Sequence, residues 1–164
     1  MSHFPLLETL ITSRTRIKLL LKFFLNENNS SYLRGLEQEF GEGSNAIRLE
    51  LNKFEKAGLL NSFGRGNRRY FKANTAHPLY NSIHTLVRQH IGIDSIIEHV
   101  AANIGSLDEV WVIGKIANGL QSTVIELALV GREVDRQYVS QLCAKTEPLI
   151  GRKISYLVFQ PEEF

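Results

Sequence analysis

The hydrophobic period of the chain changes at Gly58, and this change limits the folds open to its first half. Before Gly58, apolar residues recur three and four positions apart, which is the spacing of one face of an α-helix. After Gly58, the runs "LLNSF" and "RRYFK" are short and rich in apolar and aromatic residues, and a glycine-containing loop separates them. This pattern is typical of a β-hairpin. The sequence therefore predicts helices followed by a hairpin.

Three helices are predicted before the hairpin. The first follows Ser13 and ends before the polar loop "NENNSS". Ser31 is the predicted cap of the second helix, which Gly41 and Gly43 end. Ser44 is the predicted cap of the third helix. The buried stripe of this third helix is expected to comprise Ile47, Leu51 and Phe54.

Polar and basic side chains gather on the other face of the third helix and in the hairpin. Three helices followed by a basic hairpin predict a winged helix, in which the third helix enters the major groove and the hairpin contacts the flanking backbone or minor groove. The predicted base contacts are Asn45, Arg48 and Asn52. The remaining predicted DNA contacts are Ser44, Lys53, Arg65, Asn67, Arg68 and Arg69. The alternative is a solvated hairpin whose charge serves solubility.

The charge of the chain is unevenly distributed. Residues 1–90 hold 13 lysines and arginines against 7 aspartates and glutamates, whereas residues 91–164 hold 6 against 10. The first part is therefore basic (+6) and the second acidic (−4), although the whole chain carries only +2. A basic part is compatible with a polyanionic partner, but charge alone is also compatible with a role in solubility. The positions of the basic residues have to distinguish these two roles.

The stretch "LNKFEKAGLLNSFGRGNRRYFKAN", from Leu51 to Asn74, resembles the end of the recognition helix and the wing of ArsR-type bacterial transcription regulators. Their Leu-x-x-Leu-x-x-Ala-Gly-Leu pattern precedes a Gly-Arg wing, and Phe54 stands here for the second leucine. The resemblance covers roughly the first half of the chain. It implies a homodimer on double-stranded DNA with an inverted-repeat operator. Metal sensors of this family carry a cysteine-rich recognition helix, whereas residues 44–57 contain neither Cys nor His, so metal sensing there is not expected.

Residues 77–105 are predicted to form a helical connector. Pro78 stands where a helix can start, Gly92 interrupts the apolar stripe, and a second stripe ends at Gly105. Either stripe is a candidate dimer surface, and the alternative is packing within one chain. No metal site is predicted, because the histidines of this region lack the face-sharing spacing and the further ligands that a tetrahedral site needs. These histidines are His77, His84, His90 and His99.

From Glu109 onward the pattern of the sequence changes from helical stripes to strand-like runs. The runs "EVWVIG", "STVIELALVG" and "KISYLVF" are apolar and β-branched, which predicts three strands, the first two of them suited to the centre of a sheet. A short helix is expected between the first two strands and a longer one around Arg136 to Lys145 before the third. The single cysteine, Cys143, is interpreted as a small buried hydrophobe in this longer helix.

The stretch "IGKIANGLQSTVIELALVG", from Ile113 to Gly131, resembles the signature of the minimal nucleotidyltransferase fold. In that signature a Gly-Ser pair begins a short helix and an Asp-x-Asp pair lies on the next strand. Gly114 keeps the glycine, Lys115 replaces the serine, and Val124 and Glu126 take the aspartate positions. The resemblance, which spans roughly residues 107–159, implies a transferase scaffold without its chemistry, because such transfer needs clustered carboxylates for magnesium.

A possible vestigial ligand site at Gly114, Lys115 and Glu126 follows from this resemblance. Lys115 at a helix amino terminus would attract a small anionic or nucleotide ligand, which would make the domain a sensor. The alternative is a domain that only supports dimerisation. No catalytic residue, metal ligand or cofactor is assigned.

Together these features predict an α+β protein with a winged helix over residues 1–76, a helical connector over 77–105 and a small α/β, degenerate nucleotidyltransferase-like domain over 106–164. The predicted function is sequence-specific transcriptional regulation, without enzymatic activity. The alternatives are an active magnesium-dependent nucleotidyltransferase whose winged helix holds its substrate, and a winged helix that binds a protein. A lone cysteine, no secretory pattern and no apolar run of roughly 18 to 20 residues predict a cytoplasmic protein without a membrane segment.

Overall fold

The computed structural model describes residues 6–164, so the first five residues of the predicted domain 1–76 lie outside the described range. The fold is mixed α+β, as predicted, and it divides into two compact units. The amino-terminal unit comprises residues 6–87 together with 118–121. The carboxy-terminal unit comprises residues 88–117 and 122–164. The chain therefore passes from one unit to the other after residues 87, 117 and 121.

Three helices of the amino-terminal unit confirm the predicted segments: α2 (Arg14–Phe24), α3 (Leu33–Phe40) and α4 (Ser44–Lys56). A short helix before them, α1 (Leu6–Leu10), was not predicted. Ser13 caps α2 by accepting a hydrogen bond from the Arg16 amide at 3.1 Å, and Gly41 ends α3 with a φ of 64°. The predicted caps of the other two helices are wrong. Tyr32 precedes α3 because Ser31 pairs in a sheet, and Gly43 precedes α4, of which Ser44 is the first residue.

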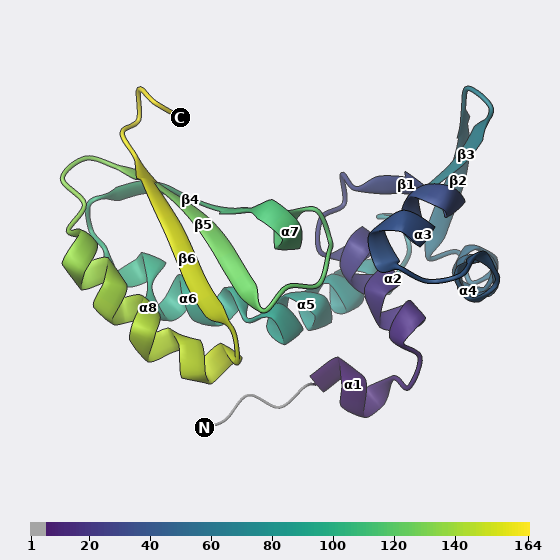
Figure 1. The fold of residues 1–164 in the computed structure, drawn as a ribbon, viewed down its shortest axis with the longest axis horizontal. Helices are drawn as coiled ribbons and strands as arrows, with labels where there is room; N and C mark the ends of the chain where they lie inside the picture. Colours follow the sequence, from purple (N-terminus) through teal and green to yellow (C-terminus); the bar gives the residue numbers. More distant parts are fainter. Residues whose placement is uncertain (1–5) are drawn as a thin grey trace. The chain divides into compact units, whose positions relative to one another are not determined.

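The predicted hairpin is confirmed and has a third strand beside it. Strands β1 (Ser30–Tyr32), β2 (Leu60–Arg65) and β3 (Arg68–Ala73) form an antiparallel sheet in the order β1-β3-β2. The inner face of this sheet buries Leu60, Phe71 and Ala73. The tip of the hairpin extends beyond the helices of its unit (Figure 1).

Helix α2 is the centre of this unit, because its sequence "IKLLLKFF" is apolar almost all the way round. Even Lys22 is buried, with 6% of its surface exposed. A buried ammonium needs partners, and Lys22 Nζ lies 2.9 Å from Glu39 Oε2 and donates to the Asn118 carbonyl at 3.0 Å. Gly119, with a φ of 73°, packs against the backbone of the same lysine. Residues 118–121 thereby complete the amino-terminal unit.

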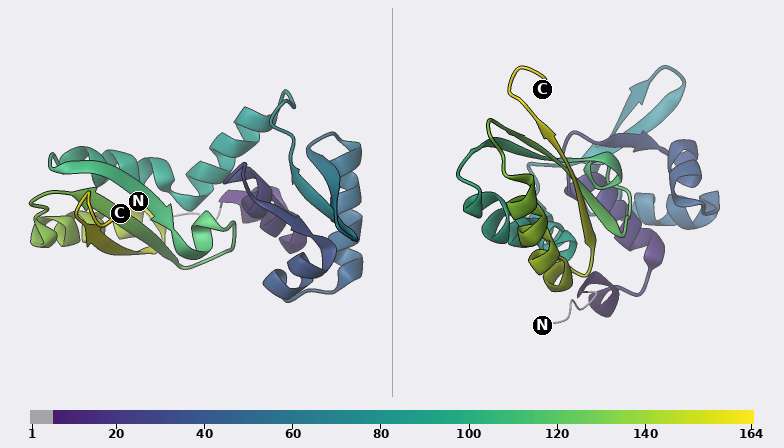
Figure 2. Two further views of the ribbon diagram at one scale, coloured as in Figure 1. Left: turned by 90° about the horizontal axis from the view of Figure 1, so that it is seen from above. Right: turned by 60° about the vertical axis from the view of Figure 1, so that its left-hand side comes forward.

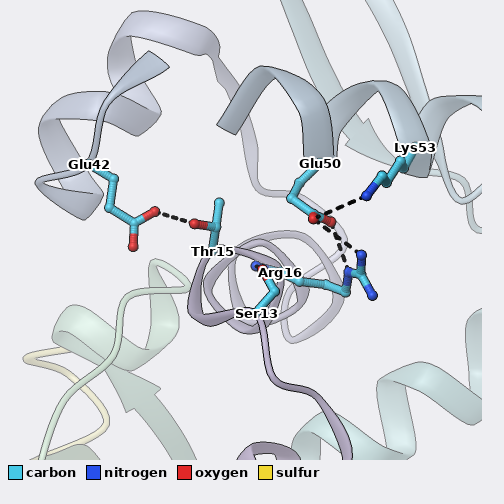
Figure 3. A network of polar contacts seen from close by, with 6 residues as sticks. All are labelled: Ser13, Thr15, Arg16, Glu42, Glu50 and Lys53. Atoms are coloured by element: carbon cyan, nitrogen blue, oxygen red, sulfur yellow. Dashed lines mark hydrogen bonds and ion pairs between the residues drawn. The ribbon is translucent and has the colours of Figure 1, made fainter. Parts of the chain in front are cut away.

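Polar contacts fix α4 and the loop that precedes it to α2 (Figure 3). Arg16 Nε donates to Glu50 Oε2 at 2.8 Å, and Lys53 Nζ lies 3.8 Å from Glu50 Oε1. Thr15 Oγ1 donates to Glu42 Oε2 at 2.5 Å. Burial alone would raise the pKa of Glu42, but hydrogen bonds from Lys18 and Thr15 hold this pKa below its usual value. The orientation of α4 is thus set by charged contacts as well as by its apolar stripe.

The predicted connector consists of α5 (Tyr80–Ile91), α6 (Ile93–His99) and a 3₁₀ turn (Ala101–Asn103). Gly92 interrupts the helices as predicted, with a φ of 94°. The second helix is shorter than predicted, because the chain turns at Val100 instead of continuing to Gly105. Within the carboxy-terminal unit, Arg152 Nη1 donates to the carbonyls of His90 and Ile91 at 2.9 and 3.3 Å, which satisfies the end of α5.

The carboxy-terminal unit contains the predicted strand, short helix, strand, helix and strand. These elements are β4 (Leu107–Ile113), α7 (Gly114–Ala117), β5 (Val124–Gly131), α8 (Arg136–Ile150) and β6 (Lys153–Phe159). The sheet order is β4-β5-β6, with β4 antiparallel and β6 parallel to β5. Helices α6 and α8 cover one face of it (Figures 1 and 2). Only β5 is central, so the prediction of a central position for β4 is wrong.

The edge position of β4 and β6 is visible in their exposure. Trp111 and Leu157 lie opposite Ala128 in the two neighbouring strands, and they are 50% and 57% exposed. Nothing in the run "EVWVIG" distinguishes an edge from a centre, since both demand β-branched residues. Among residues 6–164, no helix has the length and apolar content needed to cross a bilayer.

Cys143 lies in α8 and is buried, as predicted. Burial, followed by the negative charge of Glu147, raises the pKa of its thiol to about 11. At pH 8 only about one thiol in a thousand is then ionised, so we expect Cys143 to react with a thiol reagent about a hundredfold more slowly than a small thiol. Labelling at pH 8 with and without denaturant measures this difference. Equal labelling rates in the two conditions would contradict the buried position.

Candidate nucleic-acid interface

A groove of about 670 Å³ lies between α4, the start of α3 and the β2–β3 hairpin, within the amino-terminal unit. Its floor is apolar and includes Leu51 and Phe71. Its polar lining consists of Arg34, Arg48, Asn52, Asn67, Arg68 and Arg69. The groove therefore brings together four arginines and two asparagines from three separate elements, and five of these six residues were predicted as DNA contacts.

The orientation of α4 explains why its polar residues meet in this groove. Ile47, Leu51 and Phe54 are buried, so the residues one third of a turn away point outward. Arg48 and Asn52 are both exposed and lie one turn apart on α4, beside the hairpin. The arrangement presents a guanidinium and a carboxamide in one row, which is the chemistry that reads guanine and adenine edges.

The other predicted residues of α4 lie outside the groove lining. Asn45 is exposed one turn before Arg48, Ser44 is half-buried at the start of the helix, and Lys53 is exposed beside Glu50. Sequence reasoning missed Leu49, which is 62% exposed on the same face as Asn45 and Arg48. The exposure of Leu49 could have been predicted from the sequence, because a leucine two residues after Ile47 falls outside the buried stripe.

Arg34 was also missed, and its side chain reaches the groove from the first turn of α3. The apolar face of this helix consists of Leu33, Leu36 and Phe40, and its single basic residue has no basic neighbour at helical spacing that would mark it as part of a binding surface. Only the fold, which places the start of α3 beside α4 and the hairpin, makes Arg34 part of the basic lining.

Arg69 is already paired within the protein. Its Nη2 donates to Glu55 Oε2 of α4 at 2.6 Å and to Ser62 Oγ at 3.2 Å. Hydrogen bonds from Ser62 and Arg69 lower the pKa of Glu55, so this carboxylate stays ionised at neutral pH. The charge that Arg69 offers to a phosphate is therefore partly neutralised by Glu55.

Removing this carboxylate is expected to increase binding to DNA. In Glu55→Gln the guanidinium of Arg69 keeps a hydrogen-bond partner but loses the opposing charge, so we expect a several-fold higher affinity for random-sequence duplex at low salt. Fluorescence anisotropy measures the affinity. Glu98→Gln, which removes an exposed carboxylate from α6, is the matched control. An equal gain in both variants would indicate an effect of net charge alone.

Arg65, which was predicted beside Arg68 and Arg69, does not line the groove. Its guanidinium carbon lies 5.4 Å from the Tyr70 ring centroid and 5.9 Å from that of Phe63. Tyr70 is next to the inward-facing Phe71 on β3, so its ring lies on the outer face of the sheet. Phe63 pairs with Tyr70, and Arg65 is two residues further along β2, so Arg65 lies on the same outer face. The hairpin thus has basic residues on both of its faces.

Gly114, Lys115 and Glu126, the residues of the possible ligand site, are close together in the carboxy-terminal unit. The Lys115 amide donates to Glu126 Oε2 at 3.4 Å, and a Cβ on Gly114 would lie 1.7 Å from the same oxygen. A carboxylate of the chain therefore occupies the place beside this four-residue helix where an anion was expected. Ile113 and Ser155 lie opposite Glu126 on the neighbouring strands, so it meets no second carboxylate there.

Three of the four histidines considered for metal binding contact backbone carbonyls. His77 Nε2 lies 3.1 Å from the Ala57 carbonyl, and His84 stacks on Tyr80 with its Nδ1 2.5 Å from the Phe24 carbonyl. His99 Nδ1 lies 3.0 Å from the Ser95 carbonyl. Within residues 6–164, no three His, Cys, Asp or Glu side chains form a group that could hold a metal ion.

Comparison with known proteins gives no family assignment. Neither protein-family models nor curated proteins nor solved structures produce a match to this chain. A functional hypothesis therefore has to rest on the groove itself, which joins a concentrated positive charge to amide side chains and an apolar floor.

Proposed function

We propose that this protein is a transcriptional regulator that binds double-stranded DNA in a sequence-specific manner through its amino-terminal unit. The observation that carries the proposal is the groove beside α4, where four arginines and two asparagines from α3, α4 and the hairpin converge. Clusters of arginine and amide side chains on an exposed helix are the usual means of contacting phosphates and base edges. In this proposal the unit acts as a winged helix, with α4 as its recognition helix.

The positions of the side chains support separate roles for the helix and the hairpin. Arg48 and Asn52 form one row on the exposed face of α4, and the major groove is about 12 Å wide, enough to admit a helix. Asn45 and Leu49 extend this row, and Leu49 would contact a thymine methyl group. Asn67 and Arg68 at the hairpin would contact the flanking backbone, which fixes the register of α4 on the duplex.

The carboxy-terminal unit is proposed to support the regulator without enzymatic activity, as a degenerate nucleotidyltransferase-like domain that dimerises or senses a ligand. The isolation of Glu126 supports the absence of catalysis, because magnesium-dependent transfer needs clustered carboxylates. We further propose that the protein is a homodimer. A dimer would bind an inverted repeat whose half-sites are about one helical turn apart.

Selection from a random pool of duplex DNA tests this function directly. The full chain is incubated with the pool at two salt concentrations, and bound sequences are enriched and read. Enrichment of an inverted repeat together with salt-sensitive binding is the expected result. The proposal would fail if no sequence were enriched and binding stayed weak at low salt.

The hairpin arginines are expected to differ in their contributions to the salt dependence. Arg68→Ala should reduce the slope of log affinity against log salt by about 0.9, the value for one lost phosphate contact. Arg69→Ala should change the slope less, because Glu55 already pairs with this guanidinium. Titration of one duplex over a range of salt concentrations measures both slopes. Equal changes in the two variants would refute the compensating role of Glu55.

A further inference from the structure

The outer face of the β1-β3-β2 sheet carries a row of three aromatic rings. Tyr32, Tyr70 and Phe63 are direct cross-strand partners, one from each strand. The ring centroids of Tyr32 and Tyr70 are 5.2 Å apart, and those of Tyr70 and Phe63 are 5.7 Å apart. All three side chains are half-buried, although this face is not the one that packs on the core. Tyr32 also borders the groove, whereas the other two rings lie outside its lining.

Exposed cations surround this aromatic row. The guanidinium carbon of Arg68 lies 4.3 Å from the Tyr32 centroid, that of Arg65 lies 5.4 Å from Tyr70, and Lys72 Nζ lies 5.6 Å from Phe63. The alternation of a strand explains the pattern, because residues two apart share a face. Of the four lysines and arginines in these strands, Arg65, Arg68 and Lys72 lie on this face, whereas Arg69 lies on the Phe71 face and pairs with Glu55. The strands contain no aspartate or glutamate. The face therefore combines aromatic surface with uncompensated positive charge.

We propose that this face binds single-stranded nucleic acid, with unpaired bases stacked on the rings and the cations on the phosphates. The bases of a duplex are stacked on one another at about 3.4 Å, so their faces are not available to a protein ring. Unpaired bases expose these faces, and stacking on aromatic rings or on guanidinium planes is the common mode of single-strand binding. An acidic peptide would use the cations alone and would leave the aromatic row without a role.

The cations over the rings do not block such binding. An exposed cation–π contact is weak, so a guanidinium can move aside or take a base on its own plane. This site lies on the face of the sheet opposite to Phe71, which forms part of the floor of the duplex groove. Tyr32 and Arg68 border both surfaces, whereas Phe63, Arg65, Tyr70 and Lys72 lie outside the groove lining. The inference thus goes beyond duplex recognition, and variants at these four positions separate the two binding modes.

The test compares two oligonucleotides that carry the same charge. Wild-type protein is titrated, with fluorescence anisotropy as readout, into single strands of about 12 nucleotides of mixed DNA or RNA sequence and into an abasic strand of the same length. We expect at least about tenfold tighter binding of one base-containing strand, DNA or RNA, than of the abasic strand. Equal affinity for all of them would overturn the proposal, because only phosphates would then be recognised.

A variant pair identifies the surface. Phe63→Leu/Tyr70→Leu removes both rings while it keeps apolar side chains, and we expect its affinity for the base-containing strand to fall to the abasic level. A circular dichroism spectrum and an unchanged thermal midpoint establish that this variant is folded. Arg65→Ala/Lys72→Ala, which alters only exposed positions, should weaken binding of both strands several-fold. A retained preference for bases in the folded leucine variant would overturn the assignment to this face.

Two further measurements distinguish single-strand binding from the binding of an acidic peptide and from duplex binding. An acidic peptide of matched charge is expected to bind no tighter than the abasic strand, and binding as tight as that of the base-containing strand would overturn the proposal. Duplex binding is measured on the same samples. The leucine variant should keep the duplex affinity of the wild type, and a parallel loss on duplex and single strand would place the rings in a common site and overturn a separate platform.

Discussion

Replacement of Arg48 and Asn52 together by alanine is expected to lower affinity for a selected duplex by about a hundredfold or more. Each bidentate base contact contributes roughly 1 to 3 kcal/mol of discrimination, and about 1.4 kcal/mol corresponds to a factor of ten. Affinity for random-sequence duplex should fall only a few-fold, because the change removes a single positive charge. Both side chains are exposed, so the fold should persist. Anisotropy titrations with the selected and a scrambled duplex at one salt concentration measure the two losses.

The ratio of the affinity loss on selected duplex to the loss on scrambled duplex shows whether Arg48 and Asn52 contact bases. Lys145→Ala, which removes one exposed positive charge from α8, is the control for charge and should leave both affinities nearly unchanged. If the double variant lost the same factor on selected and scrambled DNA, Arg48 and Asn52 would contact the backbone only. The single variants then divide the effect between a guanine contact from Arg48 and an adenine contact from Asn52.

Gly119→Ala is expected to destabilise the amino-terminal unit by about 3 kcal/mol or more. Gly119 has a φ of 73°, and a Cβ there would lie 2.4 Å from the Lys22 Cα and 2.7 Å from its carbonyl oxygen. These are backbone atoms inside α2, so no side-chain rotation relieves the overlap, and a strained φ adds to the cost. We expect the first thermal unfolding midpoint to fall by roughly 10 °C. Calorimetry of the two proteins measures the shift.

Gly41→Ala is the matched control for this substitution. Gly41 has a similar φ of 64°, but no atom lies within 4 Å of the position that its Cβ would take. Only the cost of the left-handed backbone remains, about 1 kcal/mol. A shift as large as that of Gly119→Ala would attribute both effects to backbone strain and would contradict close packing of residue 119 on α2.

Local patterns predicted most of the helices and strands. The apolar stripe of α4 fixed which of its faces is exposed, and hence that Arg48 and Asn52 point outward, because both properties depend on residues three and four apart. The hairpin was equally visible from Gly58 to Lys72. Strand β1 was not, since "SSY" has no hydrophobic alternation and pairs only because β3 lies beside it. The same pairing removed Ser31 from its predicted capping role.

The features that sequence could not supply all join distant parts of the chain. Glu55 and Arg69 are fourteen residues apart, and their pairing depends on the angle between α4 and the hairpin. Arg34 reaches the groove only through the packing of α3 on α4. Glu126 was predicted as part of a vestigial ligand site, and its contact with the Lys115 amide depends on how α7 lies on β5. Short-range periodicity carries no information about such contacts.

The assignment of residues 118–121 to the amino-terminal unit has a consequence for how this protein can change in evolution. Domains that are continuous in sequence can be exchanged between genes by one recombination event at a linker. Here Asn118 and Gly119 contact Lys22 of α2, while residues on both sides of this segment belong to the other unit. A crossover near residue 87 would separate α2 from the segment that covers it. The two units are therefore expected to be inherited together, as a single piece.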